Sequence, residues 1–217
     1  MDPNVHLTSA QSPSTTDEFA QMRNVPYHTA MGSLMYASLG MRPDITYAVQ
    51  TVLRFSTKPG IAHWDAVKRI FCYLKGMKEL WLSYGGQQKE LVGYTDADGN
   101  MAEDRHAISG EYIAATYASK EALWLCSLIS QLFDTSLGST TLFSDNQSAI
   151  TLAKDHQYHA RTKHIDIQFH FIRWIVKNGS IRLVYCPTNE MVADTLTKAL
   201  PLPKVKHFAT ELGLISV

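Results

Sequence analysis

The chain has 217 residues, of which 45% are hydrophobic and 18% are charged, and this is enough apolar material for one compact core or for a small core with an appendage. Twenty Lys and Arg residues balance twenty Asp and Glu residues, so no net positive field draws the protein to nucleic acid or to an anionic membrane. Any such binding has to come from a local patch of charge.

Three cysteines, Cys72, Cys126 and Cys186, are far apart in the sequence and show no C-x-x-C spacing. This spacing excludes a disulfide scaffold and a cysteine-rich zinc site, and it is typical of a reducing compartment. The first residues lack the basic and then apolar pattern of a signal peptide. The chain also has no uninterrupted run of about 18 apolar residues, which is the length that a membrane-spanning helix needs. We therefore expect an intracellular protein without a membrane segment.

The first part of the chain predicts helices behind a flexible lead-in. Residues 1–24 are rich in Ser, Thr, Pro, Asp and Gln, which bury too little apolar surface to offset the entropy of ordering. From residue 25 to 78, apolar side chains recur with helical spacing. Pro43 and Asp44 suit a first helical turn, and Gly76 suits a helix end. We expect two or three packed helices over 25–78.

The pattern changes in the second part of the chain. Residues 80–84 and 91–95 are short apolar runs around a Gly-Gly pair, which predicts two strands with a tight connection. A loop over 98–109 then leads into a long helix, and two more strands alternate with helices. This alternation predicts an α/β domain over 79–217, with a parallel sheet and right-handed crossovers. The later strands are expected at 140–143 and 181–185, and the apolar stripe of the long helix at Ala114, Ala118, Ala122, Leu125, Ile129 and Leu132.

Four acidic residues lie where these strands and helices meet. Asp96 and Asp145 end strands, Glu111 opens the long helix, and Asp194 lies in the helix after the third strand. Side chains at the carboxyl ends of parallel strands converge. Converging carboxylates repel one another unless cations hold them, and hard oxygen ligands are those that Mg²⁺ prefers. Two such ions about 4 Å apart can clamp the attacking and leaving oxygens of a phosphodiester.

Each of these acids also has a plain structural explanation. Asp96 precedes an Asp-Gly turn, Glu111 favours a helix N-terminus, Asp145 can cap a helix, and Asp194 can lie on a solvated helix face. Acidic residues are common at caps and turns, so no single position identifies a metal site. Only the joint order of the four acids, spaced by the right elements, favours the metal site.

Several motifs resemble a known family. Those of the first part are 25–27 (VPY), 32–36 (GSLMY), 42–45 (RPDI), 54–55 (RF) and 63–70 (HWDAVKRI). Those of the second part are 93–98 (GYTDAD), 111–115 (EYIAA), 144–150 (SDNQSAI), 161–166 (RTKHID) and 193–198 (ADTLTK). The first set is similar to the end of the reverse transcriptase of copia-type LTR retrotransposons. The second set is similar to the ribonuclease H domain that follows it in the polyprotein.

The resemblance implies a ribonuclease H-like fold that hydrolyses the RNA strand of an RNA:DNA hybrid. Carried over by position, the metal-binding acids of the family fall on Asp96, Glu111, Asp145 and Asp194. The implied cofactor is a pair of Mg²⁺ ions, which Mn²⁺ could replace. The expected partners are the hybrid itself and other parts of the retroelement polyprotein.

Two departures from the family pattern limit this expectation. The polymerase palm with its Tyr-x-Asp-Asp site is absent, so we expect no DNA synthesis. Family members also carry two strands before the Glu of the long helix, whereas here Ser109 and Gly110 run straight into Glu111. The first strand thereby loses its antiparallel neighbours and keeps an unpaired edge. Our hypothesis is that the strand at residues 80–84, or a partner, covers this edge.

A basic stretch with several histidines precedes the last long helix. Contact with the phosphates of a hybrid and a solvated loop are both open explanations for it. The histidines fit no ordinary zinc-site spacing and have no cysteine nearby, so zinc binding is not expected. The candidate nucleic-acid contacts are Lys154, Arg161, Lys163, His164 and Arg173.

Three possibilities therefore remain. The first is a retrotransposon-derived hybrid ribonuclease that uses two metal ions. The second is a catalytically dead remnant that at most binds nucleic acid, and the third is a fragment with no selected function. The four retained acids favour the first possibility, and the missing hairpin favours the other two.

Overall fold

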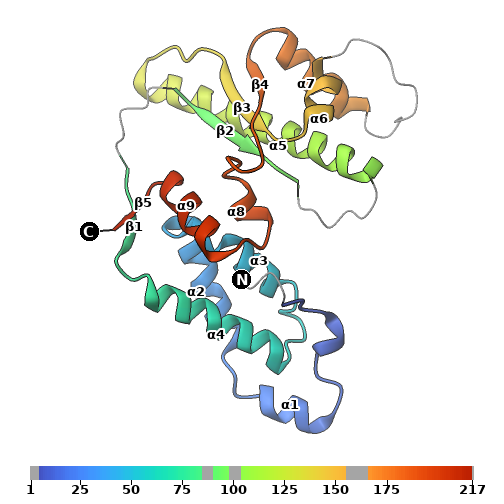
Figure 1. The fold of residues 1–217 in the computed structure, drawn as a ribbon, viewed down its shortest axis with the longest axis vertical. Coiled ribbons are helices and arrows are strands. Elements are labelled where there is room, and N and C mark those ends of the chain that lie inside the picture. The colour runs from blue at the N-terminus through green and yellow to red at the C-terminus, as the bar shows by residue number, and fades with distance from the viewer. Residues whose placement is uncertain (1–4, 85–89, 98–103, 155–165, 217) are drawn as a thin grey trace. The chain divides into compact units, whose positions relative to one another are not determined.

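The structure is a computed structural model that divides into two compact units (Figure 1). The helical unit comprises Met1–Gly85 and Lys198–Val217, and the sheet unit comprises Gly86–Thr197. Each unit has a hydrophobic core of its own. The residues that the structure describes are 5–84, 90–97, 104–154 and 166–216.

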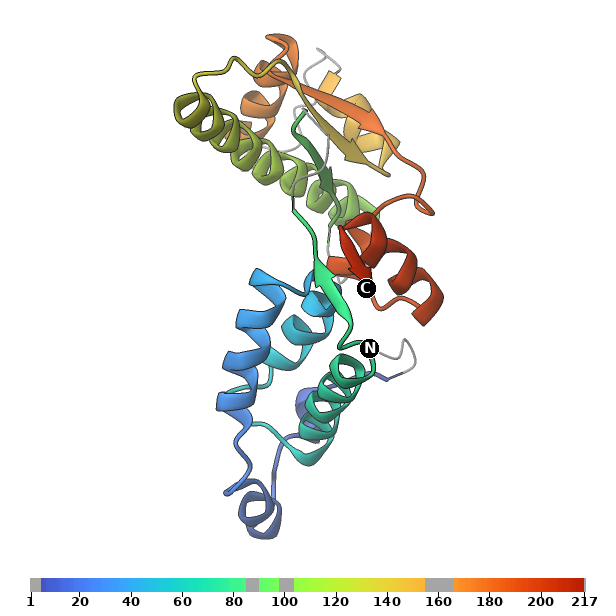
Figure 2. The same ribbon diagram turned by 90° about the vertical axis from the view of Figure 1, so that its left-hand side faces the viewer.

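The helical unit combines helices with a small antiparallel sheet (Figure 2). Strand β1 (Leu80–Leu82) pairs with strand β5 (Leu214–Ser216). The helices expected over 25–78 are confirmed. The helices of this unit are α1 (Thr16–Met22), α2 (Tyr27–Gly40), α3 (Thr46–Leu53), α4 (Ile61–Gly76) and α9 (Leu202–Glu211), with the short 3-10 turns η1 (Ser9–Gln11) and η2 (Pro43–Ile45).

Helices α2, α3 and α4 form the core of the helical unit. Tyr27, Leu34 and Val67 are at most 1% exposed. The Tyr27 hydroxyl donates to the Val52 carbonyl at 2.7 Å, which satisfies the polar end of a core side chain. Burial raises the pKa of Tyr27 to about 12, so this hydroxyl keeps its proton and remains a donor.

A buried ion pair links the start of η2 to the end of α4. The Arg42 guanidinium donates two hydrogen bonds to the Asp44 carboxylate, at 2.9 and 2.7 Å. Tyr73 donates a third to Asp44 at 2.7 Å, and Arg42 also donates to the Met77 carbonyl at 3.2 Å. Burial, together with the Asp44 charge, raises the pKa of Tyr73. The motif at 42–45 therefore serves packing in this unit.

The first 24 residues differ from the expected flexible lead-in, since from residue 5 onward they include η1 and α1. Thr15 caps α1 by accepting from the Glu18 N–H, and the Glu18 carboxylate accepts from the Thr15 N–H. His63 anchors the segment from α4. Its Nδ1 accepts from the Gly60 N–H at 2.9 Å, so its Nε2 carries the proton and donates to the Thr8 carbonyl at 3.1 Å. A local cap and one long-range hydrogen bond thus hold a segment that has few large apolar residues.

Strand β1 does not cover the edge of the parallel sheet, so the hypothesis for residues 80–84 was wrong. Its partner is β5, with Leu80 opposite Ser216 and Leu82 opposite Leu214 (Figures 1 and 2). The tight hairpin expected between 80–84 and 91–95 is not formed either, because β1 and β2 belong to different sheets. The partner comes from the far end of the chain, and local sequence patterns carry no information on such a choice.

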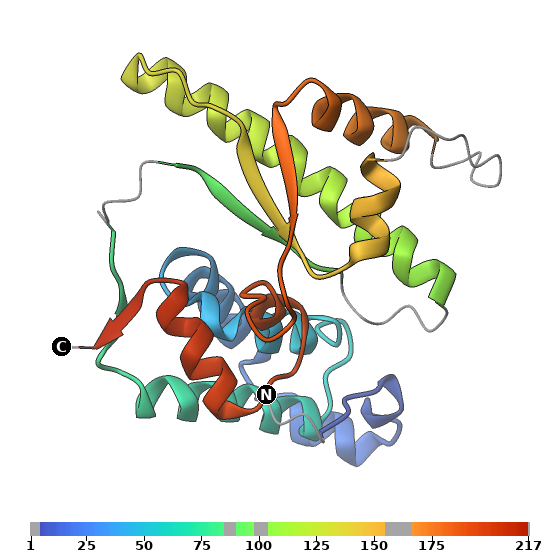
Figure 3. The same cartoon turned by 45° about the horizontal axis from the view of Figure 1, so that its top comes forward.

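The sheet unit has a parallel three-stranded sheet with helices packed against it (Figure 3). The strand order is β2-β3-β4, so each connection between neighbouring strands is a crossover that contains a helix. This arrangement confirms the expected α/β fold of the ribonuclease H type. The elements are β2 (Val92–Thr95), α5 (Asp104–Phe133), β3 (Thr140–Ser144), α6 (Gln147–Lys154), α7 (Asp166–Lys177), β4 (Ile181–Tyr185) and α8 (Asp194–Thr197).

Helices α5, α6 and α7 share one hydrophobic core with one face of this sheet. Leu142 on β3 and Leu183 on β4 are neighbours in register, and each is 2% exposed. Ile172 of α7 is fully buried in the same core. On β2, the strand on the other side of β3, Gly93 pairs with Leu142. A Cβ added to Gly93 would lie 2.5 Å from a Leu142 methyl group. Glycine on β2 therefore makes room for the leucine of the central strand.

Helix α5 begins earlier than expected, and the stripe that it buries overlaps the expected one only in part. It starts within the loop expected over 98–109. Ala122 from the expected stripe is buried, but Ala115 and Ser119 are buried as well, and Leu132 from the expected stripe is 67% exposed. The Ser119 hydroxyl donates to the Ala115 carbonyl at 2.7 Å, so a polar side chain can face the core. In the described ranges no helix, α5 included, is both long and apolar enough to cross a membrane.

Strand β2 lies at an edge of the sheet. Within the part of the chain that the structure describes, β3 pairs on both sides and β2 pairs with β3 alone. Val92 and Tyr94 on β2 are 38% and 39% exposed. This agrees with the expectation that the first strand of the sheet keeps an unpaired edge when the hairpin is missing.

Candidate metal centre

Three aspartates of the sheet unit come from three different elements. Asp96 follows β2, Asp145 follows β3, and Asp194 is the first residue of α8. Parallel strands end at the same edge of a sheet, so the strand pairing alone brings Asp96 and Asp145 together. Helix α8 follows β4 along the chain and adds Asp194.

One carboxylate oxygen from each of these aspartates lies within 4.8 Å of those of the other two. Asp194 is 1% exposed, and Asp96 and Asp145 are half-buried. Negative charges this close repel one another, and the repulsion grows as water is excluded. Carboxylate oxygens are the ligands that Mg²⁺ and Mn²⁺ prefer, so this donor group fits a divalent cation.

Two threonines orient the carboxylates. The Thr188 hydroxyl donates to Asp145 Oδ2 at 3.0 Å, and the Thr197 hydroxyl donates to Asp96 Oδ2. Thr197 lies on the same short helix as Asp194, so α8 contributes one acid and holds a second. Neither threonine was among the site residues predicted from the sequence. Thr197 does lie in the 193–198 motif, and that is the only sequence signal for it.

The negative charge of this site also acts on a neighbouring thiol. Cys186 directly follows β4 and is 7% exposed. Burial raises the pKa of the Cys186 thiol, and the charges of Glu190, Asp145 and Asp194 raise it further. The thiol therefore stays protonated, and the local field favours binding of a cation.

Glu111, the fourth predicted acid, lies beside the cluster but outside the group of three. Its Oε1 accepts from the backbone N–H of Ala97, the residue after Asp96, at 3.2 Å. Because α5 begins at Asp104, Glu111 lies about two turns inside the helix rather than in its first turn. The hydrogen bond fixes Glu111 against the end of β2.

The structure describes two of the five predicted nucleic-acid contacts, Lys154 and Arg173. Lys154 is exposed in the last turn of α6. Arg173 donates from Nε to the Leu152 carbonyl at 3.2 Å and also bonds the buried Tyr112, so it joins α7 to α6 and α5. These contacts fix the Arg173 side chain, and its predicted contact with nucleic acid stays a prediction. Arg161, Lys163 and His164 lie outside the described residues.

The chain is similar to retrotransposon polyproteins of plants. It is 39% identical over 240 residues to the retrovirus-related Pol polyprotein from transposon TNT 1-94 of Nicotiana tabacum, which covers 97% of this chain and 18% of the relative. It is 31% and 33% identical over 221 residues to the Pol polyproteins from transposons RE2 and RE1 of Arabidopsis thaliana, with 88% of this chain and 15% of each relative covered. No family model matches the chain, and no solved structure gives a significant match.

Fold and relatives together define a retroelement protein of the α/β, ribonuclease H-like class. The chain belongs to the retrovirus-related Pol polyproteins of plant copia-type transposons and corresponds to a fragment of one. It spans less than a fifth of the length of these relatives. The alignments run over 240 and 221 residues yet cover 97% and 88% of a 217-residue chain, so the relatives carry residues in this stretch that the chain lacks. This excess agrees with the missing hairpin.

Proposed function

We propose that the sheet unit is a nuclease domain that hydrolyses the RNA strand of RNA:DNA hybrids with two Mg²⁺ ions. The observation that carries the proposal is the convergence of Asp96, Asp145 and Asp194 at the carboxyl edge of a parallel sheet. The ribonuclease H-like fold and the membership of the Pol polyprotein family support the same function.

The residues of this chain would hold and orient the ions. Asp96, Asp145 and Asp194 supply the ligand oxygens, and Glu111 is assigned to the same group because it is fixed next to Asp96. When bound, the ions stabilise negative charge on the phosphate oxygens during hydrolysis. Thr188 keeps Asp145 in a fixed orientation, and outer hydrogen bonds of this kind raise both affinity and selectivity of metal sites.

The hybrid would be held by basic side chains between residues 154 and 173. Lys154 is the exposed cation of the described part of that region. Arg161, Lys163 and His164 remain proposed phosphate contacts from the sequence. Such contacts position the duplex without reading its sequence, so we expect cleavage with little sequence preference.

Hydrolysis of a labelled hybrid tests the proposal. The purified chain should release RNA fragments in Mg²⁺, and Asp145→Asn should be slower by at least about 100-fold. Asp65→Asn is the matched control, because Asp65 is an exposed acid of α4 and the charge change is the same. Equal inertness of the wild type and Asp145→Asn, with both folded by circular dichroism, would contradict the proposal.

A catalytically silent nucleic-acid-binding module is the second candidate. Two observations favour it: Glu111 lies outside the group of three aspartates, and β2 lacks the neighbours that family members have. In that case the folded chain binds the hybrid with an affinity that falls as salt rises, and it leaves the RNA uncut in both Mg²⁺ and Mn²⁺.

A further inference from the structure

Two of the three clustered aspartates each accept a hydrogen bond from a threonine hydroxyl on one carboxylate oxygen. Thr197 donates to Asp96 Oδ2, and Thr188 donates to Asp145 Oδ2 at 3.0 Å. Hydrogen bonds to a charged acceptor are stronger than neutral ones, so each hydroxyl resists rotation of its carboxylate. In both aspartates, the oxygen Oδ2 is therefore already engaged by the protein.

Thr197 connects its aspartate to the rest of the cluster. It is the last residue of α8, one turn after Asp194, and it is half-buried. Its hydroxyl also lies 3.3 Å from the Ala193 carbonyl, but it has one proton, and the charged carboxylate of Asp96 is the stronger acceptor. Helix α8 thus fixes the orientation of Asp96 relative to Asp194.

An oxygen that is held by the protein limits how a carboxylate can bind an ion. Ca²⁺ takes about 6–8 oxygen ligands and often uses both oxygens of one carboxylate, whereas Mg²⁺ requires a near-ideal octahedron and keeps several waters. A carboxylate has to turn to bring both of its oxygens to one ion, and a hydroxyl bound to Oδ2 opposes that turn. Binding through one oxygen needs no such turn.

We propose that Thr188 and Thr197 are positioning residues that make the aspartate cluster favour Mg²⁺ over Ca²⁺. They act through Asp145 and Asp96, which they restrict to binding an ion through one oxygen each. Hydrogen bonds to metal-binding side chains orient them and tune the affinity of the site. This selectivity rests on the cation site of the proposed function, and it needs no RNA or DNA.

Competition with Mn²⁺ measures this selectivity without any cleavage. The electron paramagnetic resonance signal of free Mn²⁺ reports how much of the ion the full chain binds, and Mg²⁺ or Ca²⁺ then displaces it. Thr197→Val removes the hydroxyl at similar side-chain size, and the ratio of the Ca²⁺ to the Mg²⁺ dissociation constant should fall roughly tenfold. Thr188→Val should give a smaller fall, because Thr188 is exposed and water competes for its contact. Thr197→Ser keeps the hydroxyl and should keep the ratio within about twofold of the wild type.

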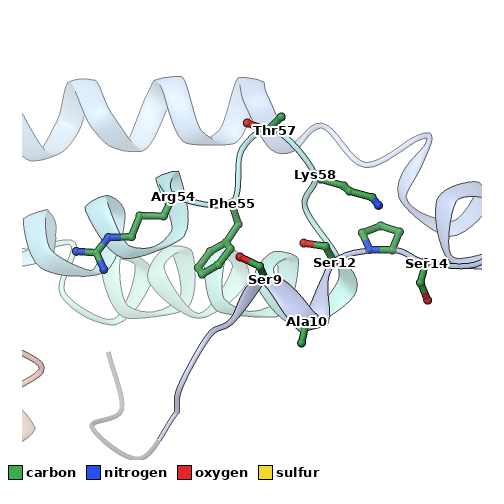
Figure 4. A pocket seen from close by; sticks show the side chains of 9 residues that line it. Ser9, Ala10, Ser12, Ser14, Arg54, Phe55, Thr57 and Lys58 are labelled. Carbon is green, nitrogen blue, oxygen red and sulfur yellow. The ribbon is translucent and has the colours of Figure 1, made fainter. Parts of the chain in front are cut away.

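A hydroxyl–carboxylate contact in the helical unit provides the matched control. Ser14 lines a pocket of that unit (Figure 4), and its Oγ donates to the Glu18 carboxylate at 3.1 Å. The backbone N–H groups of Ser14 and Thr15 also donate to this carboxylate and lower the pKa of Glu18, so the contact belongs to a helix cap. Ser14→Ala removes a hydroxyl from a carboxylate outside the aspartate cluster and should change the affinity for either ion by at most about twofold.

The ratio of dissociation constants separates a selective role of the hydroxyls from a structural one. The proposal would be overturned if Thr197→Val, folded by circular dichroism, bound both ions more weakly by the same factor. It would also be overturned if Thr197→Ser changed the ratio as much as Thr197→Val. Uptake of Mn²⁺ with an unchanged ratio in Thr197→Val would overturn the selectivity alone, whereas no uptake by the folded wild type would contradict the cation site of the proposed function itself.

Discussion

Buried carboxylates occur in both units, but the two units surround them in opposite ways. In the helical unit, Asp44 accepts two hydrogen bonds from Arg42 and one from Tyr73. In the sheet unit, Asp194 lies within 4.8 Å of two like charges, those of Asp96 and Asp145. Asp44 is 8% exposed and Asp194 is 1% exposed. The sign of the neighbouring charges, and not burial alone, therefore separates a structural carboxylate from a candidate ligand.

The largest expected change in stability follows from a substitution of Asp44, the structural carboxylate of the helical unit. Asp44→Asn leaves the Arg42 guanidinium buried without its counter-charge and should lower the free energy of unfolding by about 3–5 kcal/mol. Urea denaturation measures the loss. Asp65→Asn breaks an exposed pair with Lys68 and should cost at most about 1 kcal/mol. If the two variants were equally stable, the Arg42–Asp44 pair would not have the structural role given to it here.

A substitution at Gly60 tests how tightly the first residues are packed on the helical unit. Gly60→Ala places a Cβ against the Gln11 carbonyl oxygen and should destabilise the chain by about 1–3 kcal/mol. Gly32→Ala is the control, because Gly32 lies inside α2 with open space around it and alanine favours helix. Thermal unfolding should therefore shift down for the first variant and up for the second. Equal shifts would contradict the close packing at Gly60.

Removing one of the like charges in the sheet unit should raise the free energy of unfolding, whereas removing the Asp44 charge should lower it. In EDTA, Asp145→Asn removes a like charge and should raise the free energy of unfolding by about 1 kcal/mol. In Mg²⁺ at about 100 times its Kd, the wild type should gain about 2.7 kcal/mol that the variant does not gain. Thermal melts in both buffers provide the measurement. A variant that loses stability in EDTA would show that Asp145 is a structural residue like Asp44.

The smallest effect concerns the pH dependence of the helical unit. Burial lowers the pKa of His63 below its ordinary value of 6.5, so the unfolded chain binds more protons than the folded chain just below that pH. Stability should therefore fall as pH drops through 6.5 toward the lowered pKa, with a slope of at most about 1.4 kcal/mol per pH unit. His63→Gln should flatten this part of the profile. An unchanged slope in the variant would assign the dependence to other groups.

The architecture of the sheet unit could be predicted because its signals are local. Alternating strands and helices gave the parallel α/β fold, and the position of Asp96 and Asp145 at strand ends followed from it. Local sequence patterns could not predict which distant strands pair with each other. The partner of β1 is β5, from the other end of the chain, and no local feature of residues 80–84 indicates it. Strand pairing depends on tertiary context more than on propensity.

The contacts around the site were less predictable than its acids. Thr188 is separated from Asp145 by 43 positions, so its hydrogen bond depends on how the loop after β4 folds back. The buried stripe of α5 also differs in part from the expected one, because the Ser119 hydroxyl donates to the helix backbone and Ser119 can therefore be buried. Rules that assign polar residues to the surface miss such cases.

Isothermal titration of the metal-free chain with Mg²⁺, repeated with Mn²⁺, measures whether the three aspartates bind a cation. The wild type and Asp65→Asn should show saturable uptake, and both Asp145→Asn and Asp194→Asn should lose it. Circular dichroism of the same samples shows that each is folded. Absence of uptake by the folded wild type, or uptake that survives both substitutions, would contradict a cation site at the three aspartates.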